Sequence, residues 1–349
     1  MCRLLPAVLL AMVFVGGCGR FAPHAQHEYV YVWMRDLDLR DRVAPVNTRV
    51  AHVVNGDRLE VLDREGRFLQ VETSDGKVGW VEEHEVLDQA TYDKFQQLAQ
   101  ESAKDPVLSK GILRESYWLH DEPSGTSDRF YLLPPNTKLE LLERVSVAKP
   151  EAMPLVPAGK TAAAPELEDF WLARDAEGQV GWVRGGALDE DAPESIAVLI
   201  PDEKVVAAYV IRTVRDPEAG TADGMVPEYL AALTPWKAGL PYDFDQIRVF
   251  TWNVRRHRYE TAYLEHDLEG YLPVKMGQER FGRETDPVFS FVVATGDTAR
   301  IDGKTGRAEP GTAARESFRM EGVIVRKMGG PEAGKKIESA GKGQIRRER

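Results

Sequence analysis

Few side chains of this 349-residue sequence stand at spacings that could do chemistry. A zinc site needs about three or four protein ligands, often two histidines at a fixed helical spacing, but no HExxH motif occurs. Gly159, Lys160 and Thr161 imitate the end of a phosphate-binding loop, yet Pro154 stands where that motif needs glycine. The histidines are dispersed along the chain: His24, His27, His52, His84, His120, His257 and His266. We therefore expect no metal site and no cofactor.

Hydrolytic chemistry finds no better support in the sequence. No GxSxG motif is present, although a serine triad stays open because its members meet in space and not in sequence. Carboxylates are too numerous for a glycosidase pair to be supported or refuted by counting. We therefore predict no catalytic residue.

Both cysteines lie in the first 18 residues. Arg3 precedes an apolar run over residues 4–15, which is the outline of an export signal and too short for a membrane span of about 20 residues. Val15-Gly16-Gly17-Cys18 resembles the lipobox of bacterial lipoproteins. The resemblance implies a signal peptide over residues 1–17, acylation of Cys18 and a lipidated tether over residues 18–27. The alternative is an ordinary signal peptide with an incidental cysteine.

Acylation of Cys18 would leave no thiol for a disulfide or for a cysteine nucleophile. It would also hold the protein on a membrane, since several acyl chains on one residue give lasting attachment. The expected location is the cell envelope, facing the periplasm or the exterior. Gly19 favours the outer membrane by analogy with bacterial lipoproteins, and the inner membrane stays open.

The composition indicates a folded chain that avoids nucleic acid. Hydrophobic residues at 43% and charged residues at 29% are near average globular usage, and the length suits two or three domains. The formal net charge is −11, from 45 basic and 56 acidic residues. Affinity for nucleic acid is built from lysine and arginine neutralising phosphates, so we expect no nucleic-acid partner.

One six-residue motif occurs twice, as GKVGWV at 76–81 and as GQVGWV at 178–183, an offset of 102. Upstream, RLEVL at 58–62 pairs with KLELL at 138–142 at an offset of 80. The second copy thus holds 22 more residues, and four prolines in 143–168 predict that this insertion is a loop.

Each copy consists of short alternating apolar runs separated by turn residues, which is typical of short strands. The order DLDLRD, NGDRLEVL, RFLQVETSDGKVGWV resembles the bacterial Src homology 3 (SH3) domain. The resemblance implies a small closed barrel at residues 28–88 and a second one at residues 110–189, where WLHDEP and PNTKLELL depart from the family pattern. The expected fold class is mainly β, with two small SH3-type barrels followed by a β-rich (α+β) C-terminal domain.

The remaining segments have weaker patterns. Tyr92, Phe95, Leu98 and Ala99 recur at helical spacing and predict a linker helix over residues 89–106. Residues 192–328 resemble no family known to us and contain long β-branched and aromatic runs, with one short helix expected at VPEYLAALT, residues 226–234. Residues 329–349 have almost no apolar side chains and predict a disordered basic tail.

The resemblance implies that the SH3-type copies bind cell-wall peptide or an envelope protein. The candidate groove aromatics are Tyr29, Tyr31 and Trp33 in the first copy and Tyr117 and Trp118 in the second. Trp80 and Trp182 of the repeated motif are expected to be structural, because large aromatics in small domains usually form the core.

The predicted function is a non-catalytic binding module for peptide or peptidoglycan ligands on a lipid-anchored envelope protein. A structural or assembly factor of an envelope complex is the alternative. A hydrolase with its active site in the C-terminal domain comes third.

Overall fold

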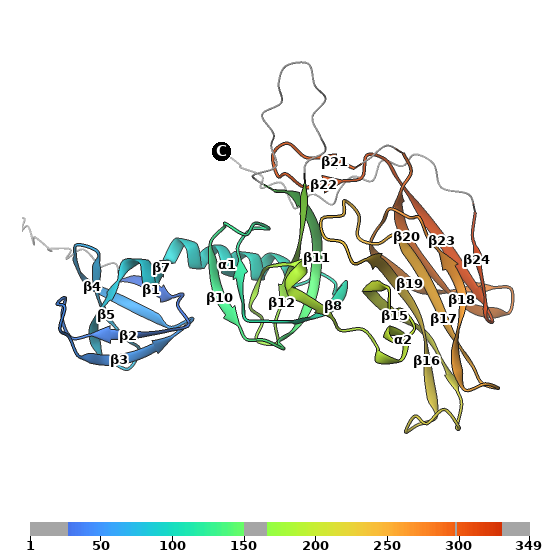
Figure 1. Cartoon of the computed structure of the whole chain (residues 1–349), viewed down its shortest axis with the longest axis horizontal. Helices are drawn as coiled ribbons and strands as arrows, with labels where there is room; N and C mark the ends of the chain where they lie inside the picture. Colours follow the sequence, from blue (N-terminus) through green and yellow to red (C-terminus); the bar gives the residue numbers. More distant parts are fainter. Residues whose placement is uncertain (1–26, 150–165, 297–298, 330–349) are drawn as a thin grey trace, which may run out of the picture.

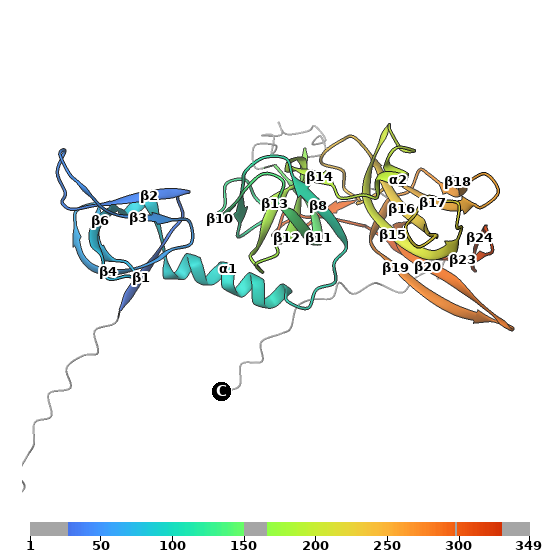
Figure 2. The ribbon, with the colours of Figure 1, turned by 90° about the horizontal axis from the view of Figure 1, so that it is seen from below.

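The computed structural model describes residues 27–149, 166–296 and 299–329. Two small β modules joined by a helix are followed by a larger β domain (Figures 1 and 2). In the described ranges, no helix has the length and apolar character needed to cross a membrane. The predicted signal peptide, Cys18, His24 and the tail beyond residue 329 lie outside these ranges.

The first module is a seven-stranded antiparallel sheet in the order β3-β2-β6-β5-β4-β1-β7. Alternation places Leu37 and Leu39 of DLDLR on its inner face, where they join one core with Val32 and Val71. The 3₁₀ turn η1 (Glu83–Glu85) precedes the last strand. The strands are β1 (Glu28–Val32), β2 (Asp36–Arg40), β3 (Arg49–Val54), β4 (Arg58–Glu65), β5 (Phe68–Glu72), β6 (Val78–Glu82) and β7 (Val86–Asp88).

The second module repeats this arrangement as β10-β9-β13-β12-β11-β8-β14, so each strand corresponds to one in the first module. Within the described residues, no pairing between the two end strands closes either sheet into the expected barrel. The 3₁₀ turn η3 (Gly185–Ala187) precedes its last strand. The strands are β8 (Ser109–Leu113), β9 (Tyr117–His120), β10 (Arg129–Leu133), β11 (Lys138–Ala148), β12 (Leu167–Arg174), β13 (Val180–Arg184) and β14 (Leu188–Glu190).

The two glycines of the repeated GxVGWV motif have different physical roles. Gly76 and Gly178 occupy hairpin turns at φ +79° and +85°, the left-handed region that favours glycine. Gly79 and Gly181 lie in the next strand, where an added Cβ would stand 2.8 and 2.6 Å from the Cβ atoms of Leu39 and Leu119 respectively. The motif therefore recurs because both modules make the same turn and the same close strand crossing.

The helix α1 (Gln89–Ser102) joins the modules and ends four residues before the predicted bound of 106. Its N-cap is Asp88, whose carboxylate accepts a hydrogen bond from the Thr91 amide. Tyr92 stacks on Tyr31 of the first module with ring centroids 3.7 Å apart. Phe95, fully buried, packs on Phe130 of the second. The helix is thus a packed connection and contacts both modules.

Asn55 adds a polar link between the modules. Its side-chain nitrogen donates to the Phe130 carbonyl at 2.9 Å, and its side-chain oxygen accepts from the Leu132 amide at 3.0 Å. Both backbone groups belong to β10, the end strand of the second sheet. Asn55 therefore pairs with that strand as a neighbouring backbone would.

The predicted insertion loop over 143–168 is wrong at both of its ends. Residues 143–148 continue β11 and residues 167–168 begin β12, paired from Glu143↔Leu172 to Ala148↔Leu167. The segment ERVSVA alternates apolar and polar residues, which suits a strand, whereas the prolines begin only at Pro150. The proline-rich part, 150–165, lies outside the described residues.

The third domain packs two four-stranded antiparallel sheets, β15-β16-β17-β18 and β19-β20-β23-β24, with β21 and β22 as a separate pair. Phe244, Phe291 and Phe318 fill the core between them. The strands are β15 (Glu203–Arg215), β16 (Met225–Pro235), β17 (Gln246–Asn253), β18 (Arg258–Glu265), β19 (Gly270–Phe281), β20 (Glu284–Ala294), β21 (Arg300–Ile301), β22 (Ala308–Glu309), β23 (Ala313–Glu321) and β24 (Ile324–Lys327).

The helix predicted at 226–234 is instead the middle of β16, paired to β15 and β17 on either side. Leu230 and Ala232 join one hydrophobic cluster, and Ala231 and Leu233 join another, so the residues alternate between two buried faces. A strand buried on both faces is apolar throughout, which hides its alternation and mimics a helix in the sequence. A short helix, α2 (Glu194–Ala197), precedes the sheets.

Candidate functional site

Two of the predicted groove aromatics meet across the modules. Trp33 follows β1 and Trp118 lies in β9, with ring centroids 5.4 Å apart. The Arg129 guanidinium lies over both rings, at 4.8 Å from Trp33 and 5.6 Å from Trp118. Both indoles are half-buried, so each retains some exposed surface. We call these three side chains the inter-module cluster.

Tyr31 is not a groove residue. It is only 6% exposed, because its ring is enclosed by Tyr92 and by Phe130, and its hydroxyl donates to Gln89 Oε1 at 3.0 Å. Burial raises the pKa of this hydroxyl. Tyr31 thus packs the first module against α1, and the expectation that it binds ligand from an open groove is wrong.

The remaining two candidates lie apart from the cluster's centre. Tyr117 is half-buried, and its hydroxyl accepts a hydrogen bond from the Arg184 amide at 3.2 Å. Burial raises the pKa of that hydroxyl. Tyr29 is also half-buried, and the Arg58 guanidinium lies 4.5 Å from its ring centre. Tyr29 and Arg58 border a wide polar concavity of the first module, which His52, Glu72 and Lys77 also line.

The two motif tryptophans differ in their surroundings. Trp182 is 3% exposed and belongs to a second cluster on the outer face of its module, where Leu98 of α1 also packs. The Arg307 guanidinium of the third domain lies 5.5 Å from its ring centre. Trp80 is half-buried and belongs to none of the hydrophobic clusters formed by the described residues.

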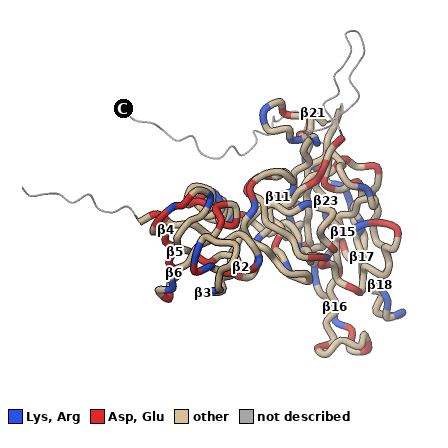
Figure 3. The backbone as a smooth tube through the Cα atoms, turned by 60° about the vertical axis from the view of Figure 1, so that its left-hand side comes forward, with Lys and Arg blue, Asp and Glu red and all other residues tan. Residues whose placement is uncertain are grey.

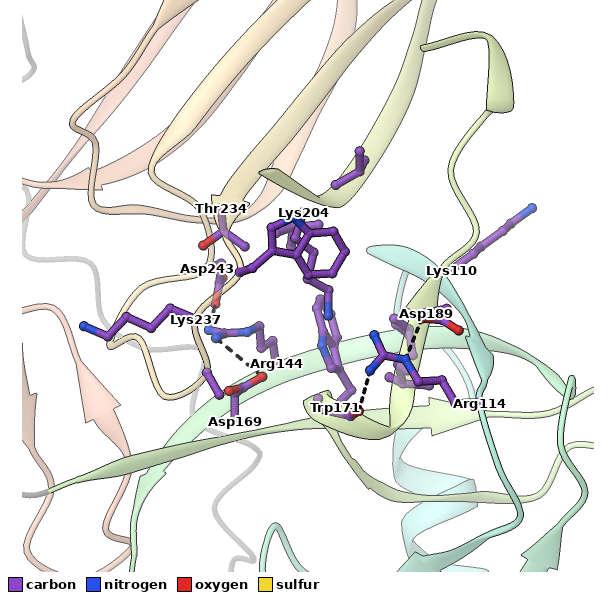
Figure 4. A pocket seen from close by; sticks show the side chains of 18 residues that line it. Lys110, Arg114, Arg144, Asp169, Trp171, Asp189, Lys204, Thr234, Lys237 and Asp243 are labelled. Atoms are coloured by element: carbon purple, nitrogen blue, oxygen red, sulfur yellow. Dashed lines mark hydrogen bonds and ion pairs between the residues drawn. The ribbon is translucent and has the colours of Figure 1, made fainter. Parts of the chain in front are cut away.

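A pocket of about 170 Å³ lies between the second module and the third domain, and we call it the junction pocket (Figure 4). Its walls come from β11, β12 and η3 of the module and from β15, β16 and the segment after β16 of the domain. Pockets at domain boundaries are frequent ligand sites. Its charged and aromatic lining residues are Lys110, Arg114, Arg144, Asp169, Trp171, Asp189, Lys204, Trp236, Lys237 and Asp243.

The extended hairpin β11–β12 builds the floor of the junction pocket. Arg144 donates to Asp243 Oδ1 at 2.9 Å and to the Tyr242 carbonyl at 2.8 Å. Asp169 accepts from the Gly239 amide at 2.8 Å, and Ser146 donates to the Leu240 carbonyl at 2.6 Å. Burial raises the pKa of Asp243 against the opposing effect of Arg144. These bonds fix the module to the domain.

The rim of the pocket combines an exposed indole with cations. Trp236 follows β16 and is 58% exposed. Arg114 donates to Asp189 at 2.6 Å on the module side. Lys110 and Lys237 stand at opposite sides of the pocket, with their side chains directed outward (Figure 4).

Sequence reasoning missed the junction pocket, because its residues come from segments far apart in the chain. Arg144 lies in the segment 143–168, the predicted insertion, and Asp169 directly follows that segment, which was the one signal available. The described residues contain no group of three or more histidine, cysteine, aspartate or glutamate side chains that could hold a metal ion. Acidic side chains outnumber basic ones overall, yet both signs are interspersed along the chain (Figure 3).

Comparison with protein families gives one match. Residues 37–86 match the bacterial SH3 domain. The match lies within the first module and begins at Leu37 of β2. No curated protein matches the chain significantly.

The solved structures named here are distant in sequence and in fold. An NlpC/P60 family protein from Bacillus cereus is 12% identical, with 49% of this chain and 61% of that chain covered at a TM-score of 0.23. NlpC2 from Trichomonas vaginalis is 8% identical, with 69% of this chain and 98% of that chain covered at a TM-score of 0.17. The chain therefore spans less than two thirds of the first of these structures. At these TM-scores neither likeness carries an argument.

Proposed function

We propose that the protein is a lipid-anchored binding protein of the bacterial cell envelope, tethered at Cys18, which holds peptide or peptidoglycan without catalysing a reaction. The observation that carries the proposal is the match of residues 37–86 to the bacterial SH3 domain. The second module has the same strand order, which supports a tandem pair of SH3 modules.

The inter-module cluster is the proposed contact surface for a peptide. SH3 domains hold extended peptides against aromatic side chains, and Trp33 and Trp118 offer two half-buried indoles beside one guanidinium. Two modules in series also raise the effective concentration of the second contact once the first is made. Weak sites of this kind suit a repetitive polymer such as peptidoglycan.

The test is retention of the purified full-length protein, held in detergent micelles, on purified cell wall and on envelope extract, beside turnover of labelled peptidoglycan. Retention on purified wall without cleavage is expected. Replacement of Trp33 and Trp118 by alanine should reduce retention, whereas Trp80→Ala, which removes a half-buried indole of the first module outside the cluster, is the matched control. Capture of one stoichiometric envelope protein and no wall would favour the assembly factor, and cleavage would favour an enzyme.

Anchoring is tested separately. We expect Cys18→Ala to remove the lipid mass and to move the protein from the membrane fraction to the soluble fraction, because one residue carries all the acyl chains. Unchanged fractionation would show that the proposed tether is wrong.

A further inference from the structure

We propose that the junction pocket binds the C-terminal residue of a short peptide, or a similar small carboxylate, with tryptophan indoles holding its apolar body. The pocket is distinct from the inter-module cluster, so this site is independent of the function proposed above. Its volume of about 170 Å³ compares with the cavities of about 150 Å³ that accept a benzene-sized molecule. The space therefore suits one amino-acid residue.

A buried hydroxyl in the pocket wall lacks a partner. Thr234 is 7% exposed, and its Oγ1 makes no hydrogen bond among the described residues. Two other buried side-chain oxygens also lack a partner in these ranges, but each is the second oxygen of a carboxylate that is already ion-paired: Asp121 with Lys94, and Glu316 with Lys327. Thr234 has no second polar atom on its side chain, so a hydroxyl is left that a ligand could pair with.

The charged side chains around the pocket favour a negatively charged ligand. Five basic and three acidic side chains line it. The carboxylates of Asp243 and Asp189 already accept from Arg144 and Arg114 respectively. Among the described residues no ion pair is found for Lys110 or Lys237, whose side chains point outward from the rim and whose charges act on the pocket from a distance. A ligand carboxylate is attracted by this net positive charge, whereas an ammonium group would be repelled.

The aromatic and aliphatic residues of the pocket wall favour a ligand with an apolar side chain. Trp171 is buried in β12, where its position is fixed by strand pairing, while Trp236 is the exposed indole of the rim. Figure 4 shows Trp171, Thr234 and Lys204 around one space, and Val205, Val206 and Leu141 complete its lining. An inorganic anion would leave these apolar surfaces wet, so the pocket fits a carboxylate that carries an apolar side chain.

The test is calorimetric titration of the full-length protein in detergent micelles with N-acetyl dipeptides ending in alanine, leucine or phenylalanine. Each acid is compared with its C-terminal amide, which differs only in the carboxylate, and with inorganic phosphate. We expect saturable binding of at least one acid, and binding of its amide weaker by about tenfold or more. Equal binding of acid and amide, or of phosphate alone, or no binding across the set, would overturn the proposal.

Three variants place the binding in the pocket. Thr234→Val keeps the side-chain shape and should weaken binding of the peptide acid by about fivefold, as expected for one lost hydrogen bond. Trp236→Ala should weaken binding of the acid further, whereas Trp80→Ala, which removes a half-buried indole outside both proposed sites, should leave it unchanged. Thr234→Val should not lower the thermal midpoint of the free protein, since the hydroxyl has no partner to lose. A lowered midpoint, or an effect of Trp80→Ala equal to that of Trp236→Ala, would contradict the assignment.

Discussion

The two modules share one strand order, yet they are joined to the rest of the molecule in different ways. The first module keeps a core of its own, made only of its own residues. The core of the second belongs to a single hydrophobic cluster that runs from Tyr31 and Phe95 to Phe318 of the third domain. The comparison teaches that two modules with one strand order can differ in what they are attached to.

The arginines Arg64 and Arg144 show this difference at one equivalent position. Arg64 of β4 is cross-strand from Leu69, as Arg144 of β11 is from Trp171. Arg64 is 47% exposed and pairs with Glu28 and Glu83 in solvent, while Arg144 is 9% exposed and pairs with Asp243. A surface ion pair of the first module thus corresponds to a buried, docking ion pair of the second.

The largest expected effect concerns the two tryptophans of the repeated motif. Trp182→Ala should lower the free energy of unfolding by about 3–5 kcal/mol, because it leaves a cavity beneath α1 and Arg307. Trp80→Ala should cost about 1 kcal/mol, since its side chain already contacts solvent. Urea unfolding followed by far-ultraviolet circular dichroism measures both. Equal losses would show that the modules use the motif in the same way.

The next effect tests the docking ion pair. Arg144→Met should destabilise the protein by about 3 kcal/mol, because it leaves the buried Asp243 without its partner. The matched Arg64→Met should change stability by about 0.5 kcal/mol or less. Asp243→Asn in the Arg144→Met background should restore part of the loss in thermal unfolding. An additive loss in the double variant would mean that the two side chains are not coupled.

A smaller effect is expected at the connection between α1 and the first module. Tyr31→Ala should cost about 2 kcal/mol, because it removes the stacked contact with Tyr92 and the edge contact with Phe130. Tyr29→Ala, at a half-buried neighbouring position, is the control and should change little. Amide hydrogen exchange of α1 measures the effect. Unchanged protection of the helix in Tyr31→Ala would contradict a packing role.

The smallest effect is a pH dependence confined to the second module. His120 of β9 opposes Trp182, as Arg40 of β2 opposes Trp80. Burial lowers the pKa of His120 from its ordinary value of 6.5, and the nearby Arg129 lowers it further. Below pH 6.5 the unfolded chain therefore binds a proton that the folded chain resists, and stability falls until the lowered folded pKa is reached.

The expected slope is no steeper than about 1.4 kcal/mol per pH unit. His120→Gln should abolish it, and urea midpoints between pH 7 and pH 5 measure it. Arg40 stays charged throughout this range, so the first module should show no such slope from that position. A slope that survives His120→Gln would assign it to other groups.

The sequence predicted the structure correctly where a short local pattern determines the backbone conformation of the same residues. The repeated glycines of GxVGWV predicted two equivalent modules, and the spacing of Tyr92 and Phe95 predicted α1. It misled at 226–234, because a strand buried on both faces shows no alternation. It also misled at Tyr31, since an aromatic near a strand end can face either a groove or a neighbouring helix.

The junction pocket could not be predicted for a different reason. Lys110, Asp169 and Thr234 are separated by long stretches of chain, so no spacing rule connects them. Only the docking of the extended hairpin on the third domain brings them together. The insertion marked the place where the two copies differ. Its prolines led to the prediction of a loop for the whole segment, although the alternating ERVSVA residues form the strand that makes the contacts.

The two hydrogen bonds of Asn55 to β10 have a consequence for self-association. An end strand with open amides and carbonyls is a template on which a strand of another molecule can pair. In the intact chain Asn55 occupies the Phe130 carbonyl and the Leu132 amide, and α1 covers the neighbouring aromatic rings. A second module produced without the first module and α1 would lose both protections and is expected to form dimers or aggregates through β10. Protection of the second module against self-association is therefore a role that we expect of the first module and α1, and one that needs no ligand.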